Sequence, residues 1–207
     1  MPRFEAVNRS KLADQTLRAC TLSPTLTCGA ELWTGEVVGS SVRDAERDAA
    51  RLLESWWGTP ARDAPLPVNP LSLARGLGIK VFRANLPPDE SGNIVIPAEG
   101  DVVITVNQSD AWNRQRFTCA HEIAHYLRRE QQGRDGQTFI DYRDTLAGMG
   151  RDPSEIYANQ FAAALLMPPH LVEEGYKQEK LSVAQLAERF ETSAAAMGLR
   201  LRNLNIA

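Results

Sequence analysis

The chain has 207 residues, enough for one domain with a substantial hydrophobic core and a small appendage. Its hydrophobic content of 43%, charged content of 24% and net charge of -3 are typical of a globular protein in water, and they argue against direct nucleic-acid binding through an overall basic surface. No apolar run approaches the roughly 20 residues of a membrane helix, the first residues lack the apolar segment of a signal peptide, and the odd number of cysteines fits a reducing cytoplasm, so we expect a cytoplasmic protein without a membrane partner.

Residues 1–41 show no sustained hydrophobic period beyond a candidate helix near Ser10–Cys20, and we interpret them as a flexible N-terminal extension. From Arg43 to Trp57, apolar residues recur at helical spacing with charges between them, which predicts an amphipathic helix. A short helix is expected to follow at residues 69–77, where an asparagine forms the N-cap and a proline occupies the first turn.

Three β-strands are expected before the middle of the chain. Residues 79–82 are predicted to form the first, and residues 93–96 and 102–106 are predicted to form a β-hairpin. The segment 131–151 is polar and rich in glycine, so we expect a long loop there.

A continuous helix is predicted over residues 114–130, since neither glycine nor proline interrupts this segment. It contains the pattern HExxH, in which His121 and His125 lie one turn apart on the same face. Two imidazoles on one face can hold a metal ion, while Glu122 stays off the metal and takes a proton from bound water. HExxH also occurs by chance in helices. This helix, however, is apolar on more than one side and is expected to be buried, where unpartnered histidines would be costly.

The segment 153–167 is predicted to form a second buried helix, with Glu155 near its start. Glu155 is either a charge placed favourably at the positive end of the helix, or the third ligand of a catalytic zinc site that keeps one position open. We favour the ligand and retain Asp141 and Asp152 as alternatives. Asn159, one turn further along, is the candidate for orienting a histidine ligand.

Two short helices are expected near the C-terminus. A capping-box pattern at Ser182 opens the first, which runs to Phe190. The second is capped by Thr192 or Ser193 and ends near Arg202. Their spacing is typical of a helix-turn-helix pair, but its arginines are few and opposed by glutamates. We therefore expect the pair to pack against the core instead of binding DNA.

Two segments, residues 116–127 (RFTCAHEIAHYL) and residues 155–168 (EIYANQFAAALLMP), resemble the ImmA/IrrE family of metallopeptidases, and the resemblance extends over roughly residues 43–204. It implies an α+β fold with a zincin-like core, in which a small, mostly antiparallel sheet packs on the buried HExxH helix and on a second buried helix that carries a ligand. The chain would then comprise the extension 1–41, a metallopeptidase domain over 42–175 and a helix-turn-helix-like segment over 176–207 that packs on the core.

Carried over to this sequence, the resemblance implies that His121, His125 and Glu155 bind Zn²⁺ and that Glu122 is the catalytic base. It implies a bacterial or phage-borne endopeptidase that cleaves a regulatory protein, a helix-turn-helix (XRE-type) repressor or antitoxin-like partner that is often encoded next to it. The alternative is a catalytically latent module that binds or senses such a DNA-binding regulator.

In zincin-like folds the substrate adds a strand to the edge of the sheet beside the active-site helix, and Val102–Val106 is the candidate edge. The residue that would assist zinc in stabilising the oxyanion is left open among Tyr126, Tyr142, Tyr157 and His170.

Overall fold

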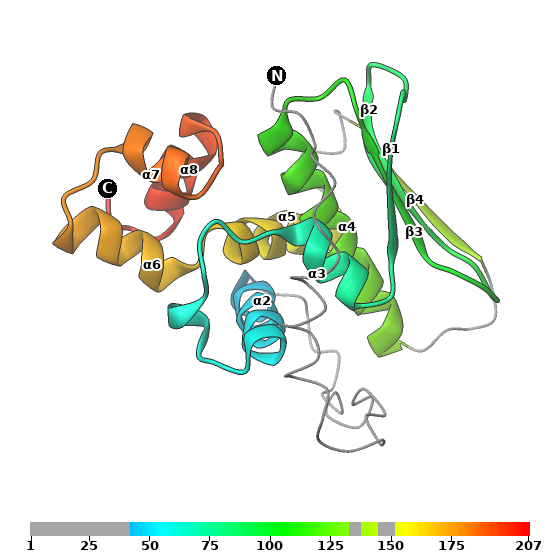
Figure 1. The fold of residues 1–207 in the computed structure, drawn as a ribbon, viewed down its shortest axis with the longest axis horizontal. Coiled ribbons are helices and arrows are strands. Elements are labelled where there is room, and N and C mark those ends of the chain that lie inside the picture. Colours follow the sequence, from blue (N-terminus) through cyan, green and yellow to red (C-terminus); the bar gives the residue numbers. More distant parts are fainter. Residues whose placement is uncertain (1–41, 133–137, 145–151) are drawn as a thin grey trace, which may run out of the picture. The chain divides into compact units, whose positions relative to one another are not determined.

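The computed structural model describes residues 42–132, 138–144 and 152–207, which form an α+β fold (Figure 1). The extension 1–41, with its expected helix near Ser10–Cys20, lies outside these described residues. The helices and strands, in chain order, are α2 (Val42–Trp57), the 3-10 helix η2 (Ala61–Asp63), α3 (Pro70–Gly76), β1 (Lys80–Ala84), β2 (Glu90–Ile96), β3 (Val103–Asn107), α4 (Trp112–Gln132), β4 (Phe139–Asp144), α5 (Pro153–Leu166), α6 (Pro169–Glu173), the π-helical turn η4 (Glu174–Gln178), α7 (Val183–Arg189) and α8 (Ala194–Asn203).

The four strands form one sheet in the order β1-β3-β2-β4. β2 pairs antiparallel with both β3 and β4, whereas β1 pairs parallel with β3. The sheet is therefore mostly antiparallel, and the predicted hairpin of β2 and β3 is confirmed. The prediction of a loop throughout 131–151 is wrong, because β4 lies within that segment and obtains its hydrogen-bonded partner from β2, far away in the sequence.

The expectation that Val102–Val106 forms the edge of the sheet is also wrong. β3 lies between β1 and β2 and is hydrogen-bonded on both sides. Its residues Ile104 and Val106 are fully buried, as expected for a strand in the interior of a sheet. The edges of the sheet are β1 and β4.

α4 packs between the sheet and α5 (Figure 1). The sheet face that it covers carries the buried isoleucines and valine of alternate positions on β2 and β3, namely Ile94, Ile96, Ile104 and Val106. Gly92 on the same face permits a close approach, since a Cβ atom there would lie 2.5 Å from Cγ2 of Thr118 on α4 and 2.6 Å from the carbonyl oxygen of Thr105 on β3. The absence of a side chain at this position therefore sets how near α4 lies to the sheet.

α5 contacts α4 on one side and α2 on another, and half of its side chains are buried. The carboxylate of Asp152 caps its N-terminus by accepting a hydrogen bond from the backbone N–H of Ser154 at 2.8 Å. Pro153 occupies the first turn, where its missing N–H has no helical partner to lose. The helix lies where the sequence predicts it, within one residue at its end.

The C-terminal helices begin as expected. Ser182 and Gln185 form the capping box of α7, and Ser193, not Thr192, caps α8. α6 and η4, between α5 and α7, were not expected from the sequence. Within the described residues, none of the helices combines the length and the apolar character needed to cross a membrane.

Candidate metal centre

His121 and His125 on α4 and Glu155 in the first turn of α5 come together where these two helices pack. The Nε2 atoms of the two histidines are 3.0 Å apart. Oε2 of Glu155 lies 3.3 Å from Nε2 of His121, and Oε1 lies 3.1 Å from Nε2 of His125. Both imidazoles are buried, while the carboxylate is 14% exposed, so the group opens toward solvent on the side of Glu155.

These separations fit a metal ion. In a tetrahedral zinc site with bonds of about 2.0–2.1 Å, neighbouring ligand atoms are about 3.3 Å apart. The observed separations of 3.0, 3.1 and 3.3 Å are close to that value. Two imidazole nitrogens and one carboxylate also form a donor set used by catalytic zinc, with room for a fourth ligand from solvent or substrate. The three side chains can therefore hold a divalent metal.

Asn159 orients one of the histidines. Its Oδ1 lies 3.1 Å from Nδ1 of His121, and an amide oxygen can only accept, so the imidazole donates its Nδ1–H. This tautomer leaves the lone pair of Nε2 directed at His125 and Glu155. This hydrogen bond meets the expectation that Asn159 contacts a histidine. Asn159 follows Glu155 by one turn of α5, so both side chains lie on the same face of that helix.

The electrostatics of the group favour an ionised glutamate. Burial by itself raises the pKa of Glu155, but the adjacent imidazoles of His121 and His125 outweigh burial and hold this pKa well below its usual value. Glu155 is therefore a carboxylate at neutral pH, which is the form that binds a metal.

Glu122 and Cys119 lie close to the histidines in sequence but outside the group of ligand atoms found among the described residues. Glu122 is 1% exposed, a position where it can act on a water without contacting bulk solvent. Cys119 is fully buried, and burial together with the neighbouring Glu122 raises the pKa of its thiol to about 12. Its thiol is therefore protonated at neutral pH.

The structure reduces the number of alternative candidates for the third metal ligand and for the residue that stabilises the oxyanion. Asp152 is exposed and its carboxylate caps α5, while the side chain of Asp141 lies outside the described structure, as does that of Tyr142. The hydroxyl of Tyr157 donates to Oδ2 of Asp48 on α2 at 2.7 Å, so it is engaged away from the histidines. Tyr126 and His170 remain predictions for the oxyanion residue.

A buried charge on α4 was not singled out from the sequence. Arg116 lies on α4 and is 1% exposed, and its guanidinium contacts the turn between α7 and α8. Its position in the sequence could have indicated its burial, since Arg116 shares a helix face with Ala120 and Ile123, which are both fully buried.

The histidine–glutamate group on two packed helices beside a small sheet is a zincin-like arrangement, and comparisons with known proteins agree. The model of the family described as IrrE N-terminal-like domain (Peptidase_M78) matches residues 74–202, more than half of the chain. Among solved structures, a Mycobacterium tuberculosis transcriptional regulator is similar, with a TM-score of 0.52 and 21% sequence identity. The similarity covers 76% of this chain and 46% of that regulator, so the chain spans about half of the regulator's length, and at this identity only the fold is shared. No curated protein matches the chain.

Proposed function

The chain belongs to the IrrE N-terminal-like family (Peptidase_M78), and we propose that it is a peptidase-type hydrolase, specifically a zinc-dependent endopeptidase that cleaves a regulatory protein. The observation that carries the proposal is the group of His121, His125 and Glu155, whose ligand atoms all lie within 4.8 Å of one another. We place the enzyme in the cytoplasm, in keeping with the buried free thiol of Cys119.

Bound Zn²⁺ would supply a Lewis acid for the scissile carbonyl and would lower the pKa of a coordinated water toward neutrality. The protein's part is to present the donors in the correct state. Asn159 holds His121 in the tautomer whose Nε2 is unprotonated. The pKa of Glu155 lies well below its usual value, so this residue is a carboxylate at neutral pH. Because these donors come from two helices, the packing of α4 against α5 determines whether the site is complete.

Glu122 is the proposed general base. As the water oxygen bonds to the carbonyl carbon, the carboxylate takes one proton from the water, and it passes this proton to the amide nitrogen as the C–N bond breaks. The products are a carboxylic acid, which keeps the second proton of the water, and an amine, and no other reactant is needed. Glu122 directly follows His121 on α4, so it lies beside the ligands while its own oxygens are outside the ligand group.

The proposed substrate is a helix-turn-helix (XRE-type) regulator encoded next to this chain. Support comes from the motifs shared with the ImmA/IrrE peptidases and, more weakly, from the fold shared with a protein described as a transcriptional regulator. A substrate segment would add to an edge of the sheet, and the edges are β1 and β4. Direct DNA binding by the C-terminal helices is not favoured, since Arg200 is buried and Arg189 forms an ion pair with Glu179.

The test is to incubate the purified chain with zinc and the neighbouring helix-turn-helix protein, and to look for a defined cut by mass spectrometry. Glu122→Gln is expected to abolish cleavage while the zinc content, measured on the same samples, is unchanged. Glu130→Gln is the matched control, since Glu130 is an exposed glutamate on the same helix, and it should cleave like the wild type.

Two results would contradict the proposal. Loss of zinc from Glu122→Gln would make Glu122 a ligand instead of the base. Equal binding of the regulator by the wild type and by Glu122→Gln, with no cut by either, would establish the alternative of a latent module that binds or senses the regulator.

A further inference from the structure

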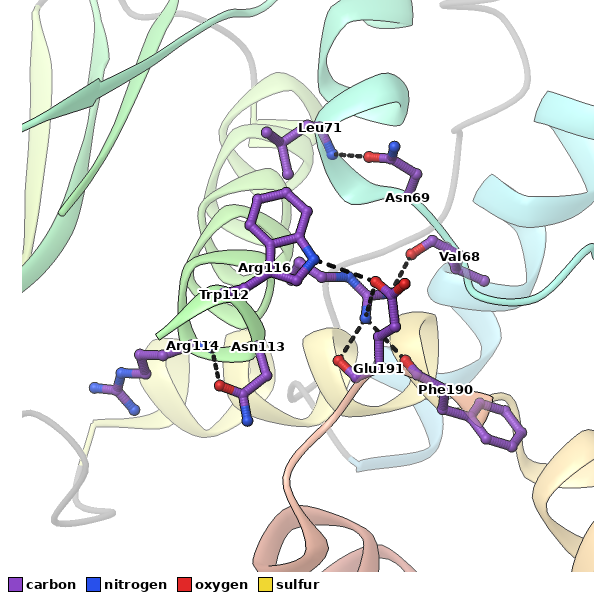
Figure 2. A network of polar contacts seen from close by, with 9 residues as sticks. All are labelled: Val68, Asn69, Leu71, Trp112, Asn113, Arg114, Arg116, Phe190 and Glu191. Atoms are coloured by element: carbon purple, nitrogen blue, oxygen red, sulfur yellow. Dashed lines mark hydrogen bonds and ion pairs between the residues drawn. The ribbon is translucent and has the colours of Figure 1, made fainter. Parts of the chain in front are cut away.

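Arg116 on α4 contacts the turn between α7 and α8 (Figure 2). Its Nη1 donates to the backbone carbonyl oxygen of Phe190 at 2.9 Å and to that of Glu191. The same nitrogen lies 3.2 Å from Oε2 of Glu191, and Nη2 donates to the carbonyl oxygen of Val68 at 2.6 Å. One side chain therefore joins α4 to the α7–α8 turn and to the segment that leads into α3.

Glu191 completes this junction from the side of the turn. Its φ angle of 49° lies in the left-handed region, which is unfavourable for a residue other than glycine. In this conformation both its carbonyl oxygen and its carboxylate reach Arg116, and the carboxylate also accepts from the indole Nε1 of Trp112 at 3.2 Å. Trp112 and Arg116 are one turn apart on α4, so the α7–α8 turn holds the beginning of this helix (Figure 2).

Arg200 on α8 makes the reciprocal connection. It is 2% exposed, and its Nε donates to the carbonyl oxygen of Met167, the residue that caps the C-terminus of α5, at 3.1 Å. Its Nη1 donates to Oε1 of Glu46 on α2 at 2.7 Å. Arg200 therefore joins α8 to the end of α5.

Buried guanidinium groups require this degree of pairing. Burial lowers the pKa of Arg116 and of Arg200, and the partly exposed carboxylates of Glu191 and Glu46 oppose that shift. A guanidinium presents its donors in a fixed plane, so its carbonyl acceptors must hold their positions. Sliding of either helix would leave a buried charge without its acceptors, which is costly.

We propose that the C-terminal brace, which we define as α7, α8 and their connecting turn (residues 183–203), sets the relative position of the two helices that carry the metal ligands. Arg116 and Arg200 are its positioning residues. Arg116 reaches into the brace from α4, the helix of both histidine ligands, and Arg200 reaches from the brace to α5, the helix of the glutamate ligand. The inference rests on the proposed zinc site. It states that residues outside the two ligand-bearing helices, on α7, α8 and their turn, help to position the ligands.

The two arms act in series. If either arginine contact is lost, the brace holds α4 and α5 together less firmly, and the ligands are less well placed before metal binds. Groups that orient ligands typically change metal affinity by about 10- to 100-fold. Releasing the second arm after the first should add less than its separate effect, because the two arginine contacts act through the same connection.

The experiment compares Arg116→Met, Arg200→Met and the double variant with the wild type. Zinc affinity is measured by competition with a chromophoric chelator, at a temperature where circular dichroism shows every variant folded. Asn107→Ala is the matched buried control, since the amide of Asn107 donates to three backbone carbonyls around the start of β2. Arg189→Met is the control for an exposed arginine on the brace.

Each single arginine variant should raise the dissociation constant for zinc about tenfold, and the double variant should raise it by less than the two effects combined. Asn107→Ala should lose stability without this change in zinc affinity. Hydrogen exchange of the metal-free chain provides a second measurement: Arg200→Met should accelerate exchange in the first half of α4, and Arg116→Met should accelerate it at the end of α5. Local damage from a substitution would accelerate exchange only near the substituted residue. Faster exchange in the other helix therefore indicates that the brace connects the two helices.

The brace is refuted if the zinc affinities of both arginine variants match that of Asn107→Ala, or if the effects of the two substitutions simply add. Should either methionine variant fail to fold, Arg116→Lys and Arg200→Lys keep the charge but not the planar set of donors, and they should show the same changes to a smaller extent. A wild type that binds no zinc would contradict the proposed function instead, and the hydrogen-exchange comparison would then still decide whether the brace exists.

Discussion

Nδ1 of His121 lies 3.1 Å from Oδ1 of Asn159, so the helix that contributes the glutamate also orients a histidine of the other helix. Glu155 and Asn159 are one turn apart on α5 and approach the same imidazole from its two nitrogens. The proposed metal ligands and the group that orients one of them therefore both lie at the α4–α5 interface.

Asn159→Ala is expected to weaken zinc binding by about 10- to 100-fold, because His121 loses the acceptor that fixes its tautomer and ring orientation. Asn159→Asp keeps an acceptor oxygen at this position and should retain most of the affinity. Titration of the metal-free proteins with zinc in the presence of a competing chelator measures both. An alanine variant with wild-type affinity would show that His121 is oriented by other contacts.

Asp152 and Glu155 have separate roles at the start of α5. Asp152→Ala removes the N-cap and should lower the free energy of unfolding by about 0.5–2 kcal/mol with zinc content unchanged. Glu155→Ala should instead reduce zinc content, since it removes one of the three proposed ligands. Chemical denaturation and metal analysis of both variants separate the two roles, and loss of zinc from Asp152→Ala would return the ligand role to Asp152.

The parts of this structure that were predictable from the sequence are those specified locally. The caps at Asn69 and Ser182 fix helix starts through side chains two or three residues from their partners. The HExxH spacing likewise acts locally, because two histidines four residues apart lie on one face of any α-helix. The sequence alone did not decide whether Glu155 or Asp152 was the better candidate ligand. That choice required the structure, in which Asp152 caps α5 and Glu155 faces the histidines of α4.

The parts that were not predictable depend on contacts between distant segments. β4 is a short, largely polar strand whose partner β2 precedes it by about forty residues, and the interior position of β3 follows from the pairing of β1, which no local pattern indicates. The acceptors of Arg116 are backbone carbonyls, and a carbonyl carries no residue type that a sequence could reveal. Charge and helical position hint that such an arginine is unusual, but they do not identify its partners.

Gly92 is expected to tolerate no side chain. In Gly92→Ala the new Cβ meets the side chain of Thr118 and the backbone of Thr105, so the free energy of unfolding should fall by about 1–3 kcal/mol. Adding Thr118→Ser removes one of the two clashes and should restore part of the loss. Gly198→Ala on α8 is the control with the opposite sign: its Cβ meets only Arg202 at 3.8 Å, and alanine favours a helix by up to about 1 kcal/mol. Equal stability of Gly92→Ala and the wild type would show that α4 can move away from the sheet.

The hydrogen bond between Tyr157 and Asp48 joins α5 to α2 in the interior. Burial and the contact with Asp48 both raise the pKa of Tyr157, so its hydroxyl stays protonated and donates to the carboxylate. Tyr157→Phe should lower the free energy of unfolding by about 1–3 kcal/mol, because the buried carboxylate loses its donor while the packing of the ring is kept. In a double-mutant cycle with Asp48→Asn, the loss caused by Tyr157→Phe should become smaller, since a neutral amide is less costly to leave without the hydroxyl. Additive losses in urea denaturation would mean that the two side chains stabilise α2 and α5 independently.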